Sequence, residues 1–193
     1  NGKIKWKIFR NGKTMKKVIV IGCPGSGKTT FAEKLQKCTG LPLYYLDAIW
    51  HKPDKTHISR DEFDKRIIEI FNEDKWIIDG NYKRTIELRI RECDTVFLFD
   101  LPTEVCLQGA AERVGKDRYE MPWIETEFDP EFKKFIEDFA EDDSVIFLLL
   151  HTNYNSNNTN ETDELPDQYI MGHLSRLSLS IILDSIYLIK IVV

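Results

Sequence analysis

The sequence predicts an α/β protein built on a parallel β-sheet, and two observations support this prediction. Short apolar runs typical of buried strands alternate with segments whose apolar residues repeat at helical spacing. Strands that alternate with helices in this way form parallel sheets with right-handed crossovers. In addition, the first apolar run, residues 18–21, leads directly into residues 22–29 (GCPGSGKT), which match the G-x-x-x-x-G-K-T pattern of a phosphate-binding loop.

We expect the 22–29 loop to bind nucleotide phosphates. Its glycines let several backbone N–H groups turn inward and form an anion site at a helix N-terminus. Lys28 is expected to reach the β- and γ-phosphates, and the Thr29 hydroxyl to ligate Mg²⁺. The expected nucleotide-binding residues are Gly22, Pro24, Gly25, Ser26, Gly27, Lys28, Thr29 and Thr30. The cofactors implied are ATP and Mg²⁺.

Length and composition limit the other possibilities. The chain has 193 residues, 42% of them hydrophobic and 31% charged, which suits one globular domain. A net charge of −5 does not indicate a nucleic-acid partner, which usually requires a basic surface. The four cysteines form no C-x-x-C pair, so neither a zinc site nor a disulfide framework is indicated. With no visible secretory signal and no long uncharged apolar run, we expect a cytoplasmic protein without membrane association.

The chain is expected to have three parts. Residues 1–14 are basic and irregular and precede Met15, so we expect an unstructured N-terminal extension. Residues 15–150 hold the alternating pattern and form a P-loop kinase-like domain. An Asn- and Thr-rich tract at residues 153–163 and a poorly periodic apolar segment follow, so residues 151–193 are expected to be an atypical C-terminal tail.

Five apolar runs are expected to form strands. They are residues 18–21, 43–46, 76–78, 96–99 and 145–150. Turn residues bound these runs. A break at residues 40–42 (GLP) precedes the second strand, and the turns at residues 79–82 (DGNY) and 100–102 (DLP) close the third and fourth.

Helices are expected between these strands. They cover residues 31–36, 59–71, 84–91, 103–114 and 129–139. Ser59 and Glu62 form a capping box at the start of the second helix. Thr103 and Asp129 are expected N-caps, and Pro130 suits the first turn of the last helix.

Three aspartates follow the second, third and fourth strands and should converge beside the phosphate loop, because ligands bind at the carboxyl ends of parallel strands. Asp79 is expected to hold Mg²⁺ through water together with Thr29, unless it serves only an Asp-Gly turn. Asp47 is expected to orient or deprotonate an acceptor hydroxyl, with capping of the next segment as the alternative. Asp100 precedes Leu-Pro and is expected to stabilise the following loop instead.

Three arginines are candidates for catalysis beside Lys28 and Asp47. Arg84 follows the 79–82 turn, whereas Arg113 and Arg118 flank a polar stretch that suits a short lid near residues 115–125. Each of them could equally be an ordinary surface arginine. Four aromatic residues could shape an acceptor pocket or simply pack in the core: Tyr44, Tyr45, Trp50 and Tyr82.

Four stretches resemble one family. They are residues 15–30, 45–47, 76–82 and 121–129. They resemble the adenylate-kinase-related P-loop proteins labelled "DNA topology modulation protein FlaR". The resemblance covers residues 15 to about 140.

This resemblance implies a P-loop NTPase three-layer sandwich of the nucleoside-monophosphate-kinase type, with strand order 2-3-1-4-5, ATP–Mg²⁺ binding and a short lid. It also implies that Asp79 helps to hold Mg²⁺ and that Arg113 and Arg118 correspond to lid arginines. The sequence departs from the family in a shortened C-terminal part. It also lacks the longer acceptor-binding region of adenylate kinase, so AMP is not established as the acceptor.

The sequence therefore predicts a P-loop kinase that transfers a phosphoryl group from ATP to a small acceptor, with a nucleotide or nucleoside as the leading class. The alternatives are a nucleotide-dependent regulatory ATPase, with a DNA-related role in view, and a truncated, poorly active paralogue. Neither the acceptor nor the oligomeric state follows from the sequence.

Overall fold

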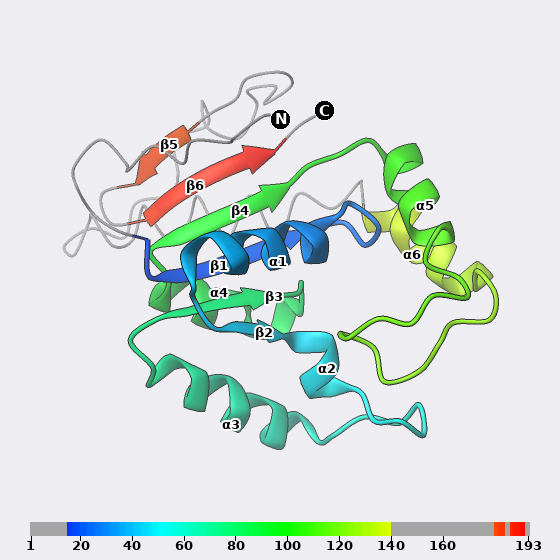
Figure 1. Ribbon diagram of the computed structural model, residues 1–193, viewed down its shortest axis with the longest axis horizontal. Helices are drawn as coiled ribbons and strands as arrows, with labels where there is room; N and C mark the ends of the chain where they lie inside the picture. The colour runs from blue at the N-terminus through cyan, green and yellow to red at the C-terminus, as the bar shows by residue number, and fades with distance from the viewer. Residues whose placement is uncertain (1–14, 140–179, 184–185, 192–193) are drawn as a thin grey trace, which may run out of the picture.

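The computed structural model describes residues 15–139, 180–183 and 186–191 (Figure 1). The expected extension at residues 1–14 and the expected strand at residues 145–150 lie outside these residues. The elements in chain order are β1 (Lys17–Gly22), α1 (Lys28–Thr39), β2 (Leu43–Tyr45), α2 (Leu46–Trp50), α3 (Arg60–Phe71), β3 (Trp76–Asp79), α4 (Lys83–Glu92), β4 (Thr95–Phe99), α5 (Thr103–Ala111), α6 (Pro130–Phe139), β5 (Ser180–Leu183) and β6 (Ile186–Ile191).

The strands form one six-stranded sheet in the order β2-β3-β1-β4-β6-β5. Every neighbouring pair from β2 to β6 is parallel, which confirms the predicted fold class. Only β5 runs antiparallel to its neighbour, β6, at the sheet edge. β1 lies between β3 and β4, with Val20 opposite Asp79 and Gly22 opposite Phe99. The loop after β1 therefore begins near the middle of the sheet.

The strand beside β4 is not the predicted one. The fifth parallel position, expected for residues 145–150, is occupied by β6, which pairs with all of β4 from Thr95 to Phe99. The expected domain boundary after residue 150 therefore does not separate the last strands from the sheet. The open edge of a strand can pair with another extended segment. The sequence pattern alone does not reveal whether residues 145–150 or residues 186–191 pair with the edge of β4.

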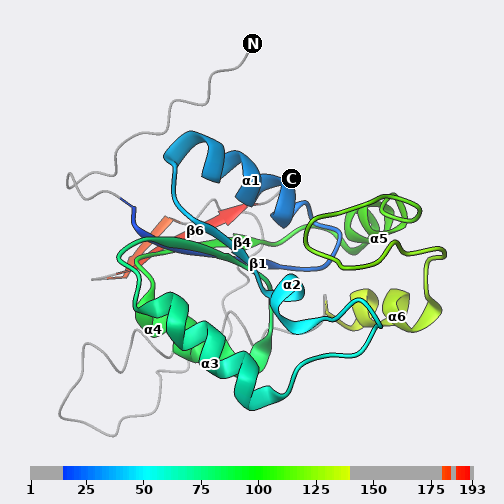
Figure 2. The same cartoon turned by 60° about the horizontal axis from the view of Figure 1, so that its bottom comes forward.

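Helices cover both faces of the sheet, with α1 on one face and α3 and α4 on the other (Figure 2). A separate hydrophobic core lies on each face. Alternate residues of a strand point to opposite faces. Val18 and Val20 of β1 are fully buried in the cluster beneath α1. Ile19 and Ile21 are fully buried in the cluster formed with α3 and α4. These layers confirm the predicted three-layer arrangement.

A short helix, α2, follows the second strand and begins at Leu46, a residue that was expected to belong to that strand. β2 ends at Tyr45, and α2 begins at Leu46, whose side chain is fully buried. Burial of Leu46 against the core draws the start of this helix toward the sheet. Asp47 consequently lies in the first turn of a helix, where a carboxylate is favourable. The predicted cap of α3 is confirmed, since the Ser59 side chain accepts a hydrogen bond from the Glu62 N–H.

Candidate functional site

The loop between β1 and α1 has the backbone shape of a phosphate cradle. Gly22, Gly25 and Gly27 have φ angles of 141°, 84° and 85°, a region that side-chain-bearing residues rarely adopt. Gly27 is the N-cap of α1, so the loop ends at the N-terminus of a helix. The predicted strand–loop–helix arrangement is therefore present.

Two polar side chains of this loop are buried. The Lys28 ammonium donates a hydrogen bond to the Cys23 carbonyl at 2.9 Å. Burial lowers the pKa of Lys28, an effect that the nearby Asp79 charge opposes. The Ser26 hydroxyl is buried without a hydrogen-bond partner among the described residues. A buried ammonium and an unpaired hydroxyl beside inward-curled backbone fit an anionic ligand such as a nucleotide phosphate.

Thr29 and Asp79 meet across the strand ends. The Thr29 hydroxyl donates a hydrogen bond of 2.7 Å to Asp79 Oδ2. Asp79 Oδ1 is buried and has no partner within the described part of the chain. Burial raises the pKa of Asp79 to about 6, against the opposing effects of Lys28 and Thr29.

These groups fit Mg²⁺. The ion prefers oxygen ligands and usually binds one or two carboxylates, waters and substrate phosphates instead of an all-protein cage. Thr29 and Asp79 supply a hydroxyl and a carboxylate next to the phosphate cradle. Among the described residues, no group of three or more His, Cys, Asp or Glu could hold a metal ion.

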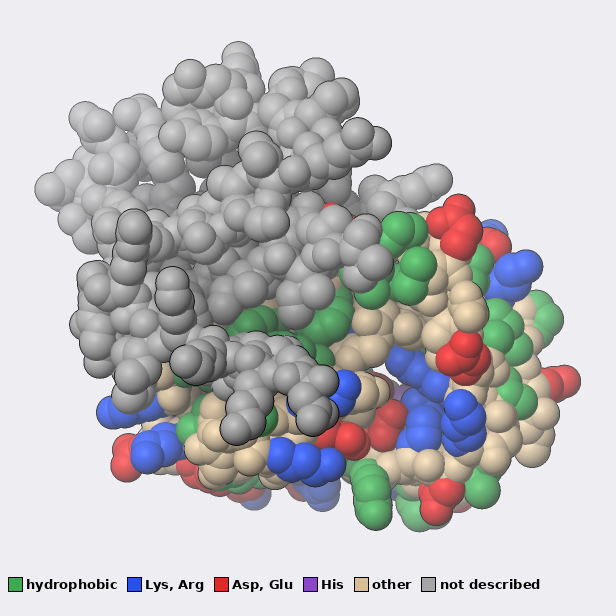
Figure 3. All heavy atoms as spheres, turned by 45° about the horizontal axis from the view of Figure 1, so that its top comes forward, with side chains coloured by type: hydrophobic (Ala, Val, Ile, Leu, Met, Phe, Trp, Pro, Cys, Tyr) green, Lys and Arg blue, Asp and Glu red, His purple; other side chains and the backbone are tan. Residues whose placement is uncertain are grey.

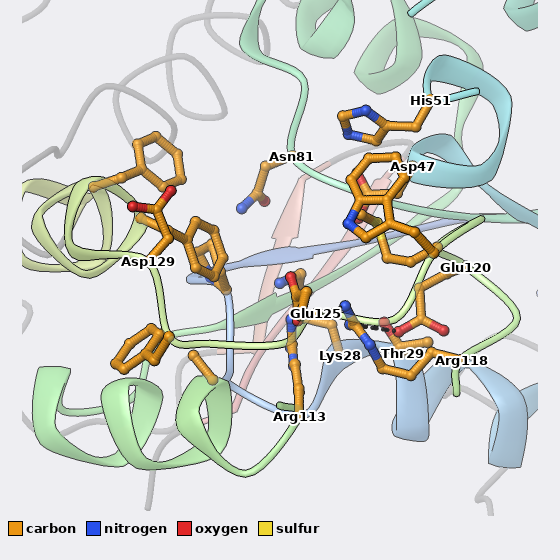
Figure 4. A pocket seen from close by; sticks show the side chains of 18 of the residues that line it. Lys28, Thr29, Asp47, His51, Asn81, Arg113, Arg118, Glu120, Glu125 and Asp129 are labelled. Carbon is orange, nitrogen blue, oxygen red and sulfur yellow. Dashed lines mark hydrogen bonds and ion pairs between the residues drawn. The ribbon is translucent and has the colours of Figure 1, made fainter. Parts of the chain in front are cut away.

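A cavity of about 800 Å³ opens beside this loop. That volume is typical of small-molecule sites. In Figure 3, acidic and basic side chains gather around a hollow in the described surface. Figure 4 shows Asp47 and His51 on one side of the cavity and Asp129 on the other, with Lys28 between them. The lining includes the charged residues Lys28, Asp47, Lys55, Asp79, Lys83, Arg113, Arg118, Glu120, Glu125, Glu127 and Asp129.

The segment between α5 and α6 contains residues 115–125, for which a lid is expected from the sequence. It contains no helix or strand and is closed by a hydrogen bond from the Gly115 N–H to the Glu125 carbonyl at 2.7 Å. Arg118 donates to Glu120 and to Glu125, each at 3.0 Å, and all three side chains are largely shielded from solvent. Arg113 lines the cavity without an ion pair to any described carboxylate, and burial lowers its pKa. It is a cation available to an anionic ligand.

Four of the five predicted catalytic residues lie together. Lys28, Asp47, Arg113 and Arg118 all line the cavity. Arg84 does not. Its guanidinium forms hydrogen bonds of 2.5 and 2.6 Å to the two carboxylate oxygens of Asp64 on the exposed side of α3. Asp100 is likewise absent from the lining.

One side of the cavity, opposite Asp129, is built around Asp47 (Figure 4). The Tyr82 hydroxyl donates to Asp47 Oδ1 at 2.9 Å. His51 lies edge-on to Trp123, with 5.1 Å between ring centroids. Of the four aromatic residues considered from the sequence, Tyr82 lines this cavity. Tyr44, in contrast, hydrogen-bonds Glu73 at an exposed position.

Sequence reasoning missed the role of Asn81. Its side-chain oxygen accepts a hydrogen bond from the Gly22 N–H at 2.8 Å, and its amide N–H donates to the Gly22 carbonyl. The Asn81 side chain therefore hydrogen-bonds both the N–H and the carbonyl of Gly22, the first residue of the phosphate loop. Asn side chains commonly satisfy backbone groups near turns, so the 79–82 turn was a signal for such a role.

Comparisons with known proteins agree with the fold. No family model matches the chain. Adenylate kinases of Thermotoga petrophila and Thermotoga neapolitana are 31% and 30% identical over 85 residues, which is 43% of this chain and 38% of each relative. The chain thus matches well under half the length of these relatives. Shikimate kinase from Bacteroides thetaiotaomicron matches with a TM-score of 0.50 and 15% identity, over 68% of this chain and 81% of that chain.

These similarities support an adenylate-kinase-like P-loop fold. The relatives named above do not carry the narrower "DNA topology modulation protein FlaR" label, so that resemblance stays a prediction. In the part of the chain that the structure describes, no helix has the length and apolar character needed to cross a membrane.

Proposed function

We propose that this protein binds ATP–Mg²⁺ and transfers the γ-phosphoryl group to a small acceptor, with a nucleotide or nucleoside as the leading class. The observation that carries the proposal is the contact between Thr29 and Asp79 beside the buried Lys28. Phosphoryl transfer requires positioning and charge neutralisation more than covalent chemistry. A hydroxyl, a carboxylate and an ammonium at the mouth of a phosphate cradle supply the donor half of such a site.

The residues divide into roles. The loop backbone and Lys28 would hold the β- and γ-phosphates, while Thr29 and Asp79, the latter through water, would hold Mg²⁺, which neutralises phosphate charge when bound. Arg113 and Arg118 would stabilise charge on the transferring group, and the segment around residues 115–125 would exclude water. Arg118 must then leave Glu120 or Glu125, because its guanidinium is engaged by both.

The similarity to adenylate kinases and the kinase fold support this function. An adenylate kinase transfers a phosphoryl group between nucleotides, and we propose the same donor chemistry for this chain. The cytoplasmic location and the absence of a nucleic-acid partner also remain proposals.

Coupled ADP release tests the proposal. Protein and ATP–Mg²⁺ are assayed against nucleoside monophosphates, nucleosides and small hydroxylated metabolites. We expect one acceptor to stimulate turnover and Lys28→Ala to lower that turnover at least about a hundredfold. Lys37→Ala, an exposed lysine on the same helix, is the matched control.

Nucleotide binding is measured separately by thermal denaturation. ATP–Mg²⁺ at a hundredfold excess over Kd should stabilise the fold by about 2.7 kcal/mol. Slow hydrolysis that no small molecule stimulates would favour a regulatory ATPase. An absence of stabilisation at millimolar nucleotide would contradict a working site.

A further inference from the structure

We propose that the phosphoryl-accepting group is a hydroxyl whose proton passes to Asp47, and that Tyr82 is the positioning residue for that carboxylate. This rests on the proposed phosphotransferase function and narrows its acceptor. Among nucleotides and nucleosides, it selects a hydroxyl of a nucleoside, or of another small ring-bearing molecule, over the phosphate of a nucleoside monophosphate.

The two carboxylate oxygens of Asp47 differ in their hydrogen bonding. The Tyr82 hydroxyl donates to Oδ1 at 2.9 Å. Within the described part of the chain, Oδ2 takes part in no hydrogen bond or ion pair. Asp47 lines the same cavity as Lys28 and Thr29, so a molecule in that cavity can contact both the carboxylate and the phosphate-binding loop (Figure 4). Oδ2 is therefore placed to accept a proton from a bound hydroxyl.

Packing holds the Tyr82 ring in place. Its centroid lies 4.8 Å from that of Phe63 and 6.0 Å from that of Trp50. The Tyr82 carbonyl accepts a hydrogen bond of 2.9 Å from the buried Arg89, which also binds the Gly80 carbonyl at 2.8 Å. Burial and the nearby Asp47 charge raise the pKa of the Tyr82 phenol far above its usual range, so the hydroxyl stays protonated as a donor.

The three arginines of α4, the helix that begins next to Tyr82, are already engaged. Arg84 forms its two-point pair with Asp64, and Arg89 is fully buried against backbone carbonyls. A phosphate acceptor carries about two negative charges at neutral pH and is typically held by arginine. Here it would instead lie against the Asp47 carboxylate, which disfavours it by like-charge repulsion. A neutral hydroxyl meets no such repulsion.

Two lysines line the same cavity. Lys55 lies at an exposed loop tip, and Lys83 is the first residue of α4. Both belong to the acceptor-side segments, so they could contact an anionic substituent elsewhere on the acceptor. They do not replace an arginine clamp on the reacting group, because a lysine presents a point charge without the two-point geometry that matches a phosphate.

The step balances without a further reactant. The acceptor oxygen forms a bond to the γ-phosphorus while the bond from that phosphorus to the β,γ-bridging oxygen breaks. ADP leaves, and the hydroxyl proton moves to Asp47 Oδ2 and then to solvent. Lys28 and Arg113 stabilise the charge that spreads over the phosphoryl oxygens.

The experiment compares nucleosides and other hydroxyl compounds with the matching monophosphates by coupled ADP release. We expect a hydroxyl compound to stimulate turnover more strongly than its phosphorylated form. Asp47→Asn should lower kcat by about 10²- to 10⁴-fold with little change in the KM for ATP. Asp47→Glu, which keeps a carboxylate, should retain more activity than Asp47→Asn and guards against a variant that simply fails to fold.

A double-mutant cycle tests Tyr82 as a positioning residue. Tyr82→Phe should lower kcat about tenfold and leave the KM for ATP unchanged. In the Asp47→Asn background the same change should have an effect of less than about twofold, because the two residues act as a unit. Tyr44→Phe, which removes a hydroxyl bonded to Glu73 outside the cavity, is the matched control.

The outcomes separate this inference from the general function. Stronger stimulation by a monophosphate than by its nucleoside overturns the hydroxyl acceptor but leaves the phosphotransferase in place. Full activity of Asp47→Asn likewise overturns the proposed proton transfer to Asp47 and leaves the phosphotransferase in place. Additive effects in the cycle overturn the role of Tyr82 alone. Stimulation by no member of the panel overturns both proposals.

Discussion

Gly109 of α5 packs directly against Gly25 of the phosphate loop. A Cβ atom on Gly109 would lie 2.1 Å from the Gly25 carbonyl oxygen, and one on Gly25 would lie 1.9 Å from the Cys106 carbonyl oxygen. Neither distance is compatible with a side chain. The shape of the phosphate loop is therefore supported by a helix that begins more than seventy residues later in the chain.

We expect Gly109→Ala to damage nucleotide binding. In an unconstrained helix this change stabilises by up to about 1 kcal/mol. Here the added methyl group must displace the loop backbone, so we expect a loss of about 1–3 kcal/mol in unfolding free energy and a weaker affinity for ATP. Urea denaturation and nucleotide titration measure both. Gln108→Ala, at the exposed neighbouring position, is the control, and a stabilised Gly109→Ala with normal binding would refute the packing argument.

Asp79 should make the nucleotide-free protein less stable as the pH rises from about 4 to about 6. Its pKa is raised from 3.8 to about 6, chiefly by burial, so across this window the folded protein keeps a proton that the unfolded chain has lost. The contribution of Asp79 to the free energy of unfolding is complete below pH 4 and lost above pH 6. It amounts to at most about 3 kcal/mol.

Urea denaturation at several pH values checks this expectation. Asp79→Asn should remove the dependence, so the variant gains stability relative to the unmodified protein as the pH increases. Asp74→Asn, at an exposed position just before β3, is the control. A stability difference between Asp79→Asn and the parent that does not vary with pH would contradict the assigned shift.

Arg89 should be important for stability although it does not line the cavity. It is fully buried, and its guanidinium donates to the Gly80 and Tyr82 carbonyls. Burial lowers its pKa to about 10. Arg89→Ala removes the donor to the Gly80 carbonyl and one of the donors to the Tyr82 carbonyl, which also accepts from Thr85. It also opens a cavity, so we expect a loss of about 3 kcal/mol in unfolding free energy.

Arg91→Ala provides the comparison on the same helix. Arg91 is exposed and pairs with Glu87 one turn away, so its removal should change the unfolding free energy by less than about 0.5 kcal/mol. Equal effects of the two substitutions would show that the hydrogen bonds from Arg89 to the Gly80 and Tyr82 carbonyls do not stabilise the fold.

Cys38 should be the one thiol that reacts rapidly in the folded protein. It is exposed, whereas Cys23, Cys93 and Cys106 are buried. Burial raises the pKa of Cys93 to about 12, which lowers its thiolate fraction further. Titration with a coloured thiol reagent should give a single fast equivalent that Cys38→Ser abolishes, and a second fast equivalent would contradict the burial.

The sequence by itself determined the parts of this protein that depend on local chemistry. Residues 22–29 are contiguous, and the glycine conformations and helix start that they require are encoded within them, so the phosphate loop could be predicted. Alternating apolar periodicities are also local, which is why the parallel α/β class was predicted correctly. Asp79 followed a recognisable strand, and general strand-end geometry placed it near Thr29.

Only the tertiary structure decided which distant side chains meet. Arg84 and Arg113 were equivalent candidates in the sequence, but α4 turns Arg84 toward Asp64 on α3, whereas Arg113 faces the cavity. Likewise, the sequence predicted residues 145–150 beside β4, but in the tertiary structure β6 occupies that position. Such contacts depend on which helix face points inward and which strand edge is left open. Packing of the whole chain sets both, so no local pattern in the sequence records them.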